Sequence, residues 1–222
     1  MSNGVTVFYK EKAMSNGTQL ERLWRLQTKI NMLVSDGKRD PMAVADIYQS
    51  ILDGAAGRSW REEDGVIYFS VESDGTTGED WITRLESKGF RVGDYAKQVL
   101  RSTDFKPTSG VTTETVVLPG SFFGDKDLDT AKIRDEAKKR KLVTPNAELA
   151  CLIREKFRDD EIEAMGLWYI VAMHEPMSDS DGDPRLLDAR RDVGGRWLSA
   201  SYVRPGRRWH RDGGFAFAVS PQ

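Results

Sequence analysis

The first part of the chain has apolar residues at helical spacing. They recur at steps of three and four residues: Leu20, Leu23, Trp24, Leu26, Ile30 and Leu33. Thr18 is a suitable N-cap for this helix, and Asp36-Gly37 predicts its end. Asp40-Pro41 then predicts the start of a second helix, before the small-residue joint at 54–57. We therefore predict a helical hairpin over residues 1–57, which packs on the rest of the chain or on another copy.

From Trp60 onward the spacing of apolar positions changes. Val66–Val71 is rich in β-branched and aromatic residues and predicts a strand. Thr76 and Glu79 fit a capping box, and Gly89 predicts the end of the helix that follows. Further strands are predicted at 113–118, 167–173, 197–203 and 215–219. Further helices are predicted at 95–100 and 159–165, and two more within 130–157, where Asn146 is the predicted N-cap of the second. We assign the stretches between the last three strands to loops. Strands at both ends with helices between them predict an α+β domain over residues 58–222.

Composition narrows the class of protein. The chain has 222 residues, 39% hydrophobic and 31% charged, with a net charge of -2, so it is not a polyanion binder by bulk charge. The single cysteine, Cys151, excludes an intramolecular disulfide framework, and no stretch approaches the length of a membrane helix. The first residues lack the layout of a signal peptide, which predicts a cytoplasmic location and leaves export by another route open.

No group of residues indicates catalysis. Asp179-Ser180-Asp181-Gly182-Asp183 resembles the start of a calcium loop, but Pro184 and Arg190 stand where an EF-hand needs Gly and Glu. An acidic turn is the favoured interpretation, with a looser calcium site at the three aspartates as the alternative. His174-Glu175 lacks the second histidine of a zincin motif. Cys151 stands among apolar residues and predicts a buried thiol. We therefore predict a non-enzymatic protein without a metal or cofactor.

The C-terminal segment has an unusual composition. Nine arginines follow the last lysine, Lys156, and they alternate with aromatic residues such as Trp197 and Trp209. Such a pattern is compatible with a nucleic-acid surface built from arginines and stacking rings.

Most of the same segment also lacks four amino acids. Lys, Glu, Gln and Met together number 38 in residues 1–177 and are absent from residues 178–221, where the earlier frequency predicts about 9. The absence indicates a restriction on which amino acids this segment contains.

A family resemblance accounts for this restriction. Gly195–Ala200, Pro205, Arg208-Trp209, Arg211 and Gly214–Val219 resemble the C-terminal end of the variable proteins of diversity-generating retroelements. Those proteins resemble the formylglycine-generating branch of the C-type lectin fold. The upstream residues Met173–Pro176 and Asp179–Pro184 are similar to proteins of candidate-phylum bacteria. The resemblance covers about residues 60–220 and implies a C-type-lectin-like domain behind the helical hairpin. The chain lacks the active-site cysteine pair of the formylglycine-generating enzymes and a lectin-type calcium motif.

What the resemblance implies fits the missing residues. In this family a reverse transcriptase copies a template with errors at adenines, often in asparagine codons, and the resulting codons never encode Lys, Glu, Gln or Met. By this interpretation the diversified region is about 190–214, with Trp197, Trp209, Phe215 and Phe217 as core anchors. The residues between these anchors are then the variable, ligand-contacting ones: Val193, Gly194, Ser199, Ser201, Tyr202, Val203, Arg204, Gly206, Arg207, His210, Asp212 and Gly213.

These observations lead to one functional hypothesis and one alternative. Along the predicted strand, Ser199, Ser201 and Val203 alternate with Leu198, Ala200 and Tyr202, so one face is expected to be displayed and the other buried. Tyr202 falls on the buried face and fits this scheme least well. The hypothesis is a binding protein that recognises variable macromolecular targets, with proteins favoured as partners over nucleic acids. The alternative is a nucleic-acid-binding module that uses the arginines.

Overall fold

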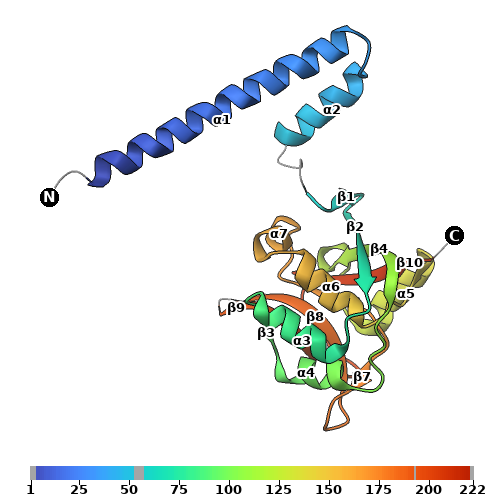
Figure 1. The fold of residues 1–222 in the computed structure, drawn as a ribbon. Helices are drawn as coiled ribbons and strands as arrows, with labels where there is room; N and C mark the ends of the chain where they lie inside the picture. Colours follow the sequence, from blue (N-terminus) through green and yellow to red (C-terminus); the bar gives the residue numbers. More distant parts are fainter. Residues whose placement is uncertain (1–3, 53–57, 193, 221–222) are drawn as a thin grey trace. The chain divides into compact units, whose positions relative to one another are not determined.

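The computed structural model describes residues 4–52, 58–192 and 194–220. The chain divides into two compact units, Met1–Arg58 and Ser59–Gln222, a boundary one residue beyond the one that the sequence predicts. Figure 1 shows both units, coloured along the sequence. They are described separately below.

The first unit contains two helices, α1 (Gly4–Ser35) and α2 (Pro41–Leu52). The predicted start of the first helix at Thr18 is wrong, because α1 begins at Gly4 and Thr18 lies within it. Ser15-Asn16-Gly17 has the composition of a turn, but no proline interrupts the helix there, so the backbone hydrogen bonds continue. The second start is as predicted: Pro41 is the first helical residue, and the Asp40 carboxylate accepts from the backbone N–H of Met42 at 3.0 Å.

The second unit is a mixed α+β domain, as the order of predicted helices and strands indicates. Its strands are β1 (Arg61–Glu63), β2 (Val66–Asp74), β3 (Arg91–Val92), β4 (Ser109–Pro119), β5 (Leu142–Val143), β6 (Tyr169–Ala172), β7 (Met177–Ser178), β8 (Pro184–Asp192), β9 (Gly195–Tyr202) and β10 (Gly213–Val219). Its helices are α3 (Gly78–Ser87), α4 (Asp94–Arg101), α5 (Thr130–Lys139), α6 (Glu148–Lys156) and α7 (Asp159–Ala164), with a short 3-10 turn, η1, at Gly120–Phe122.

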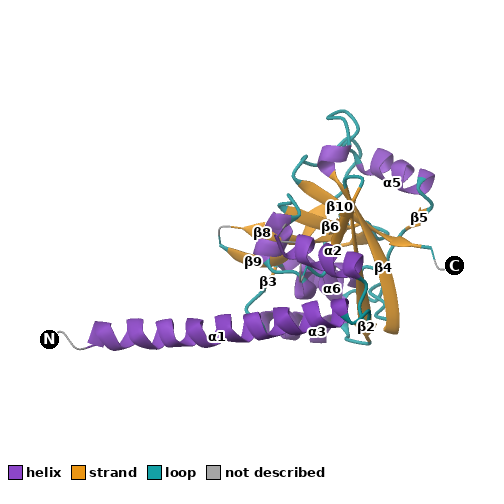
Figure 2. Ribbon diagram, turned by 90° about the horizontal axis from the view of Figure 1, so that it is seen from above, coloured by secondary structure: helices purple, strands orange, loops and turns teal. Residues whose placement is uncertain are grey.

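All ten described strands belong to one sheet. The main path runs β1-β2-β4-β10-β6-β8-β9-β3, with β5 added to β10 and β7 to β8. The pairs β6–β10 and β3–β9 are parallel and the other pairs are antiparallel. Hydrophobic cores lie on both faces: α3, α4 and α6 contribute to one, and α5 to the other. Figure 2 shows α5 and α6 on opposite sides of the sheet.

Two predictions about local structure need correction. The N-cap of α3 is Thr77, whose hydroxyl accepts from the backbone N–H of Asp80 at 3.3 Å, whereas the predicted cap Thr76 hydrogen-bonds to Asp74. Each threonine stands three residues before an acidic residue, so the capping motif alone does not show which of the two is the N-cap. The segment Pro184–Asp192, predicted as a loop, is the strand β8. Its Leu186 and Leu187 are both fully buried, since this central strand has a core on each face and lacks the usual alternation.

Candidate functional site

The segment between β9 and β10, residues 203–212, is a crossover connection. β9 and β10 run in the same direction, because β9 is antiparallel to β8, β8 is antiparallel to β6, and β6 is parallel to β10. The chain must therefore return along the sheet before β10 begins. Val203 and Trp209 pack against the core on the α5 side, so the crossover covers that face. We refer to residues 203–212 as the crossover loop.

Trp209 anchors the crossover loop. Its side chain is buried and its ring lies 5.8 Å from that of Phe215. The indole Nε1 donates to the Thr130 hydroxyl at 3.0 Å, and the Trp209 backbone N–H donates to the Leu128 carbonyl at 2.7 Å. Three of the four predicted core anchors, Trp209, Phe215 and Phe217, are buried. These contacts fix Trp209 against the core and so hold the residues on either side of it in place.

Three side chains of the crossover loop project into solvent. Arg204, Arg208 and His210 are exposed, and within the described residues none of their side chains makes a hydrogen bond or ion pair. Pro205 and Gly206 form a turn between the first two, with Gly206 at a φ of +78° that glycine adopts without strain. Sequence reasoning placed Arg208 in the constant framework, but its exposure groups it with Arg204 and His210.

Arg207 and Asp212, both predicted contact residues, differ in their surroundings. The half-buried Arg207 lies with its guanidinium 5.3 Å from the centre of the Trp209 ring and donates to the Tyr202 carbonyl. It therefore holds the loop in shape and is not free for a ligand. Asp212 has an exposed side chain, while its backbone carbonyl accepts from the Trp168 N–H at 2.7 Å.

The predicted display of one face of β9 is wrong at Ser201. Leu198 and Ala200 do face the core that α3, α4 and α6 cover, as the alternation predicts. On the opposite face Ser199 is half-buried, but Ser201 is buried and hydrogen-bonded to Asp188 at 2.9 Å. That face is covered because Arg190 from β8 and the crossover loop lie over it, an arrangement that the assignment of β8 as a loop could not anticipate.

Tyr202 and Val203 are half-buried at the end of β9. The Arg185 guanidinium lies 3.8 Å from the centre of the Tyr95 ring and 5.2 Å from that of Tyr202. Val203 packs against the core beside α5, and its N–H donates to the Pro184 carbonyl at 2.8 Å. Both residues thus have structural contacts besides any role in binding.

The glycines and Trp197 complete the predicted set. Val193 lies outside the described residues, and Gly194 is exposed. Gly213 is buried, and a Cβ atom there would lie 2.4 Å from the Tyr169 ring, so the prediction of a variable side chain at this position is wrong. The prediction that Trp197 is a core anchor is also wrong. It is half-buried at the sheet margin, beneath the Arg91 guanidinium at 5.3 Å, since β9 is followed only by the two-residue strand β3.

Most of the late arginines are engaged within the protein. Five of the nine form ion pairs with carboxylates: Arg158, Arg185, Arg190, Arg191 and Arg211. Arg196 lies over the Phe90 ring at 4.5 Å, and Arg207 lies over Trp209. Only Arg204 and Arg208 lack such contacts among the described residues. A nucleic-acid surface built from all the arginines would therefore require many of these contacts to break.

The remaining candidate residues have structural environments. Asp179 accepts from the backbone N–H groups of Asp181 and Asp183 at 2.9 Å and from Arg185 at 2.6 Å, which is the geometry of an acidic turn. Within the described residues no group of three or more histidine, cysteine or acidic side chains is placed to hold a metal ion. Cys151 is buried as predicted, and burial raises the pKa of its thiol. Burial also lowers the pKa of His174 to about 4.

Comparisons of the chain with protein-family models, curated proteins and solved structures find no match. Among the described residues, no helix has the length and apolar character that crossing a membrane requires.

Proposed function

We propose that this protein is a non-enzymatic binding protein that recognises macromolecular targets, favouring proteins, through the crossover loop. The observation that carries the proposal is that the segment with the restricted composition contains the exposed loop. The segment without Lys, Glu, Gln or Met, residues 178–221, contains the whole crossover loop with its exposed, unpaired side chains Arg204, Arg208 and His210. A loop anchored by a buried tryptophan tolerates exchange of such side chains without loss of the fold.

We further propose that this surface is diversified by a retroelement, with Ser59–Gln222 as a C-type-lectin-like domain. The resemblance of the C-terminal framework supports this, and so do the amino acids missing from residues 178–221. The positions best suited to variation are Gly194, Arg204, His210 and Asp212, because their exposure leaves room for other side chains. Gly206 is exposed too, but its φ of +78° favours glycine and disfavours other residues. Arg, His and Ser also provide the large contacts and adaptable hydrogen bonds that antibody loops use.

The genetic part of the proposal is tested by sequencing the DNA that flanks the gene. We expect a near-copy of the coding sequence for about 190–214, differing at adenines of the template, beside a reverse-transcriptase gene. Codons for Ser201 and Gly213 should differ little between gene copies, since both residues are buried. An intact locus with neither element would contradict diversification.

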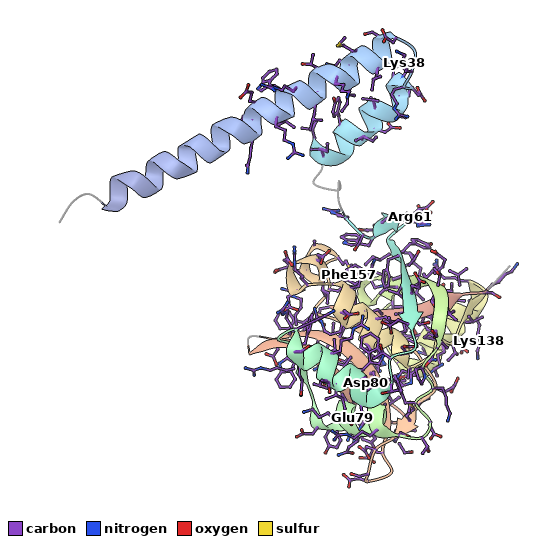
Figure 3. All side chains as sticks on the ribbon, viewed as in Figure 1. Lys38, Arg61, Glu79, Asp80, Lys138 and Phe157 are labelled. Carbon is purple, nitrogen blue, oxygen red and sulfur yellow. The ribbon has the colours of Figure 1, made fainter. Side chains whose placement is uncertain are left out.

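The binding part is tested with a triple variant, Arg204→Ser, Arg208→Ser and His210→Ser. We expect a target captured by the natural protein to be lost while the unfolding transition changes little, because these side chains are exposed and make no hydrogen bond or ion pair with the described residues. A variant with Lys106→Ser and Lys138→Ser, which removes exposed charge elsewhere, is the control and should retain binding. Figure 3 shows the Lys138 side chain at the surface of the domain. Binding to random oligonucleotides that weakens steeply with salt would instead favour the nucleic-acid alternative.

A further inference from the structure

The helical unit exposes far more apolar surface than a stable two-helix unit can. None of its described side chains is buried, whereas the second unit has an extensive core. Nine large apolar side chains are 51–79% exposed: Leu20, Leu23, Trp24, Leu26, Met32, Met42, Ile47, Ile51 and Leu52. Figure 3 shows side chains projecting from both helices of this unit. Exposed apolar area of this extent indicates an interaction site.

The two helices cannot cover each other because their lengths differ. α1 has 32 residues and α2 has 12, so at about 1.5 Å per residue α1 extends roughly 30 Å beyond the reach of α2. Figure 1 shows this difference in length. Leu20 and Leu23 therefore lie where their own hairpin offers little to pack against. A two-helix unit in which none of the described side chains is buried also lacks the tertiary packing from which most helical stability comes.

A groove between the helices is shaped for another apolar element. It has a volume of about 410 Å3 and is lined by Ile30, Leu33, Val44, Ile47 and Tyr48, among others. The Tyr48 hydroxyl is shielded from solvent, yet it has no hydrogen-bond partner among the described residues. A buried hydroxyl normally has a partner, so this one indicates that the groove is completed by an element that lies outside the hairpin.

We infer that the occupant is the hairpin of a second copy of this chain. The size of the surface fits such a dimer. One large apolar side chain contributes roughly 60–120 Å2, so nine of them exposed by half or more supply on the order of 500 Å2 per copy. Homodimer interfaces are about 65% apolar, which converts this to roughly 800 Å2 of total area per copy. That is the size of a standard stable interface.

The charges of the hairpin favour self-association. Its described side chains include four acidic and five basic residues. The acidic ones are Glu21, Asp36, Asp40 and Asp46, and the basic ones are Arg22, Arg25, Lys29, Lys38 and Arg39. A symmetric interface brings the same surface from both copies together, so a surface of one sign would repel itself and a mixed one does not. Fewer large apolar side chains are exposed among the described residues of the second unit, where Val111, Val143 and Val219 line one shared pocket.

The test measures the molar mass of the full chain by light scattering from low to high micromolar concentration. We expect at least twice the 25.0 kDa of one chain. Leu23→Glu on α1, or Ile47→Glu on α2, places a charge in the apolar face and should give a monomer. Lys29→Glu places an acidic side chain at an exposed charged position of α1, away from Leu23 around the helix, and should leave the mass unchanged. Near-ultraviolet circular dichroism should show an unaltered second unit in all three variants.

Two results would overturn the inference. A natural protein that is monomeric at every concentration would mean that the apolar face is covered by its own chain or by a different protein. Variants at Leu23 and Ile47 that both keep the oligomeric mass would place self-association on another surface. Neither result depends on target binding by the crossover loop, so failure of this inference and failure of the proposed function are distinguishable.

Discussion

The Ser201 hydroxyl donates a 2.9 Å hydrogen bond to Asp188, a carboxylate with no exposed surface. Arg190 donates to the other oxygen of Asp188 at 3.0 Å and to the Ser201 hydroxyl at 3.1 Å. The carboxylate is thus satisfied from both sides, as a buried charge must be. This closed network joins β8 to β9 directly beneath the crossover loop. The surface proposed to vary therefore lies on residues that are hydrogen-bonded to one another, so a change in one of them affects the others.

The network predicts unequal costs for neighbouring serines. Ser201→Ala should lower the free energy of unfolding by about 1–3 kcal/mol, because it removes a hydrogen bond to a buried charge. Ser199→Ala, two residues away on the same face, should have little effect, since Ser199 is half-buried and outside the network. Urea denaturation followed by tryptophan fluorescence measures both values. Equal stability of the two variants would contradict the role assigned to Ser201.

Removal of the Asp188 carboxylate should lower the free energy of unfolding more than Ser201→Ala does. Asp188→Ala leaves the Ser201 hydroxyl and the Arg190 guanidinium without their shared partner, and since the Arg190 side chain is 34% exposed we expect a loss of about 2–4 kcal/mol. The expected result is a large drop in the urea midpoint. The double variant Asp188→Ala with Arg190→Met removes both charges and should recover part of the loss. No recovery would mean that the pair is not coupled as the geometry indicates.

The two tryptophans of the C-terminal framework should respond differently to truncation. Trp209→Ala opens a cavity in the core beside α5 and removes the bond to Thr130, so we expect a loss of about 3–5 kcal/mol. Trp197→Ala should cost clearly less, because Trp197 is only half-buried. Thermal denaturation of both variants provides the comparison. A larger loss for Trp197 would contradict the assignment of Trp209 as the anchor.

The sequence predicted those elements that depend on local signals. The starts of α2 and α3 follow from Asp40-Pro41 and from threonines before an acidic residue, with α3 one residue off. β8 could not be predicted in this way, because a strand buried on both faces has no alternation and its Pro184 and arginines are typical of loops. Its neighbours in the sheet, β6 and β9, lie close to it in sequence, and only the pairing with both of them makes Asp188 and Arg190 part of a strand.

At the candidate site, too, the sequence predicted only the features that depend on local signals. Exposure of Arg204 and His210 follows from the turn chemistry around Pro205-Gly206, which is local. Burial of Ser201 and Gly213 depends on Asp188 and Tyr169, which stand far from them in sequence and reach them only through the sheet. Alternation along one strand identifies its two faces but not what covers each of them.

Gly213 should tolerate no side chain. In Gly213→Ala the new methyl group would meet the Tyr169 ring, which cannot move freely because its hydroxyl accepts from the His210 N–H at 3.1 Å. Overpacking of this kind costs about 1–3 kcal/mol. Gly194→Ala is the control, since its nearest neighbour would be the end of the Arg91 side chain at 3.5 Å. Differential scanning calorimetry should show a lower melting temperature for the first variant only.

The two histidines predict a specific dependence of stability on pH. His174 is buried: its Nε2 accepts from the Leu187 N–H at 3.0 Å and its Nδ1 bonds the Glu175 carbonyl at 2.6 Å, which requires the neutral ring. Burial lowers its pKa to about 4, from an unfolded value of about 6.5. As the pH falls through this interval, the unfolded chain takes up a proton and the folded one does not. Stability should therefore decrease with falling pH, by on the order of 3 kcal/mol in total.

The comparison of variants isolates this effect. His210 is exposed, so His210→Asn should keep the decrease between pH 6.5 and pH 4. His174→Asn should be less stable at pH 7, because it disturbs the bonds to Leu187 and Glu175, but it should lose most of the slope in this interval. Unfolding free energies from urea titrations at successive pH values measure the slopes. A slope that His174→Asn leaves unchanged would assign the pH dependence to other groups, such as carboxylates that titrate near pH 4.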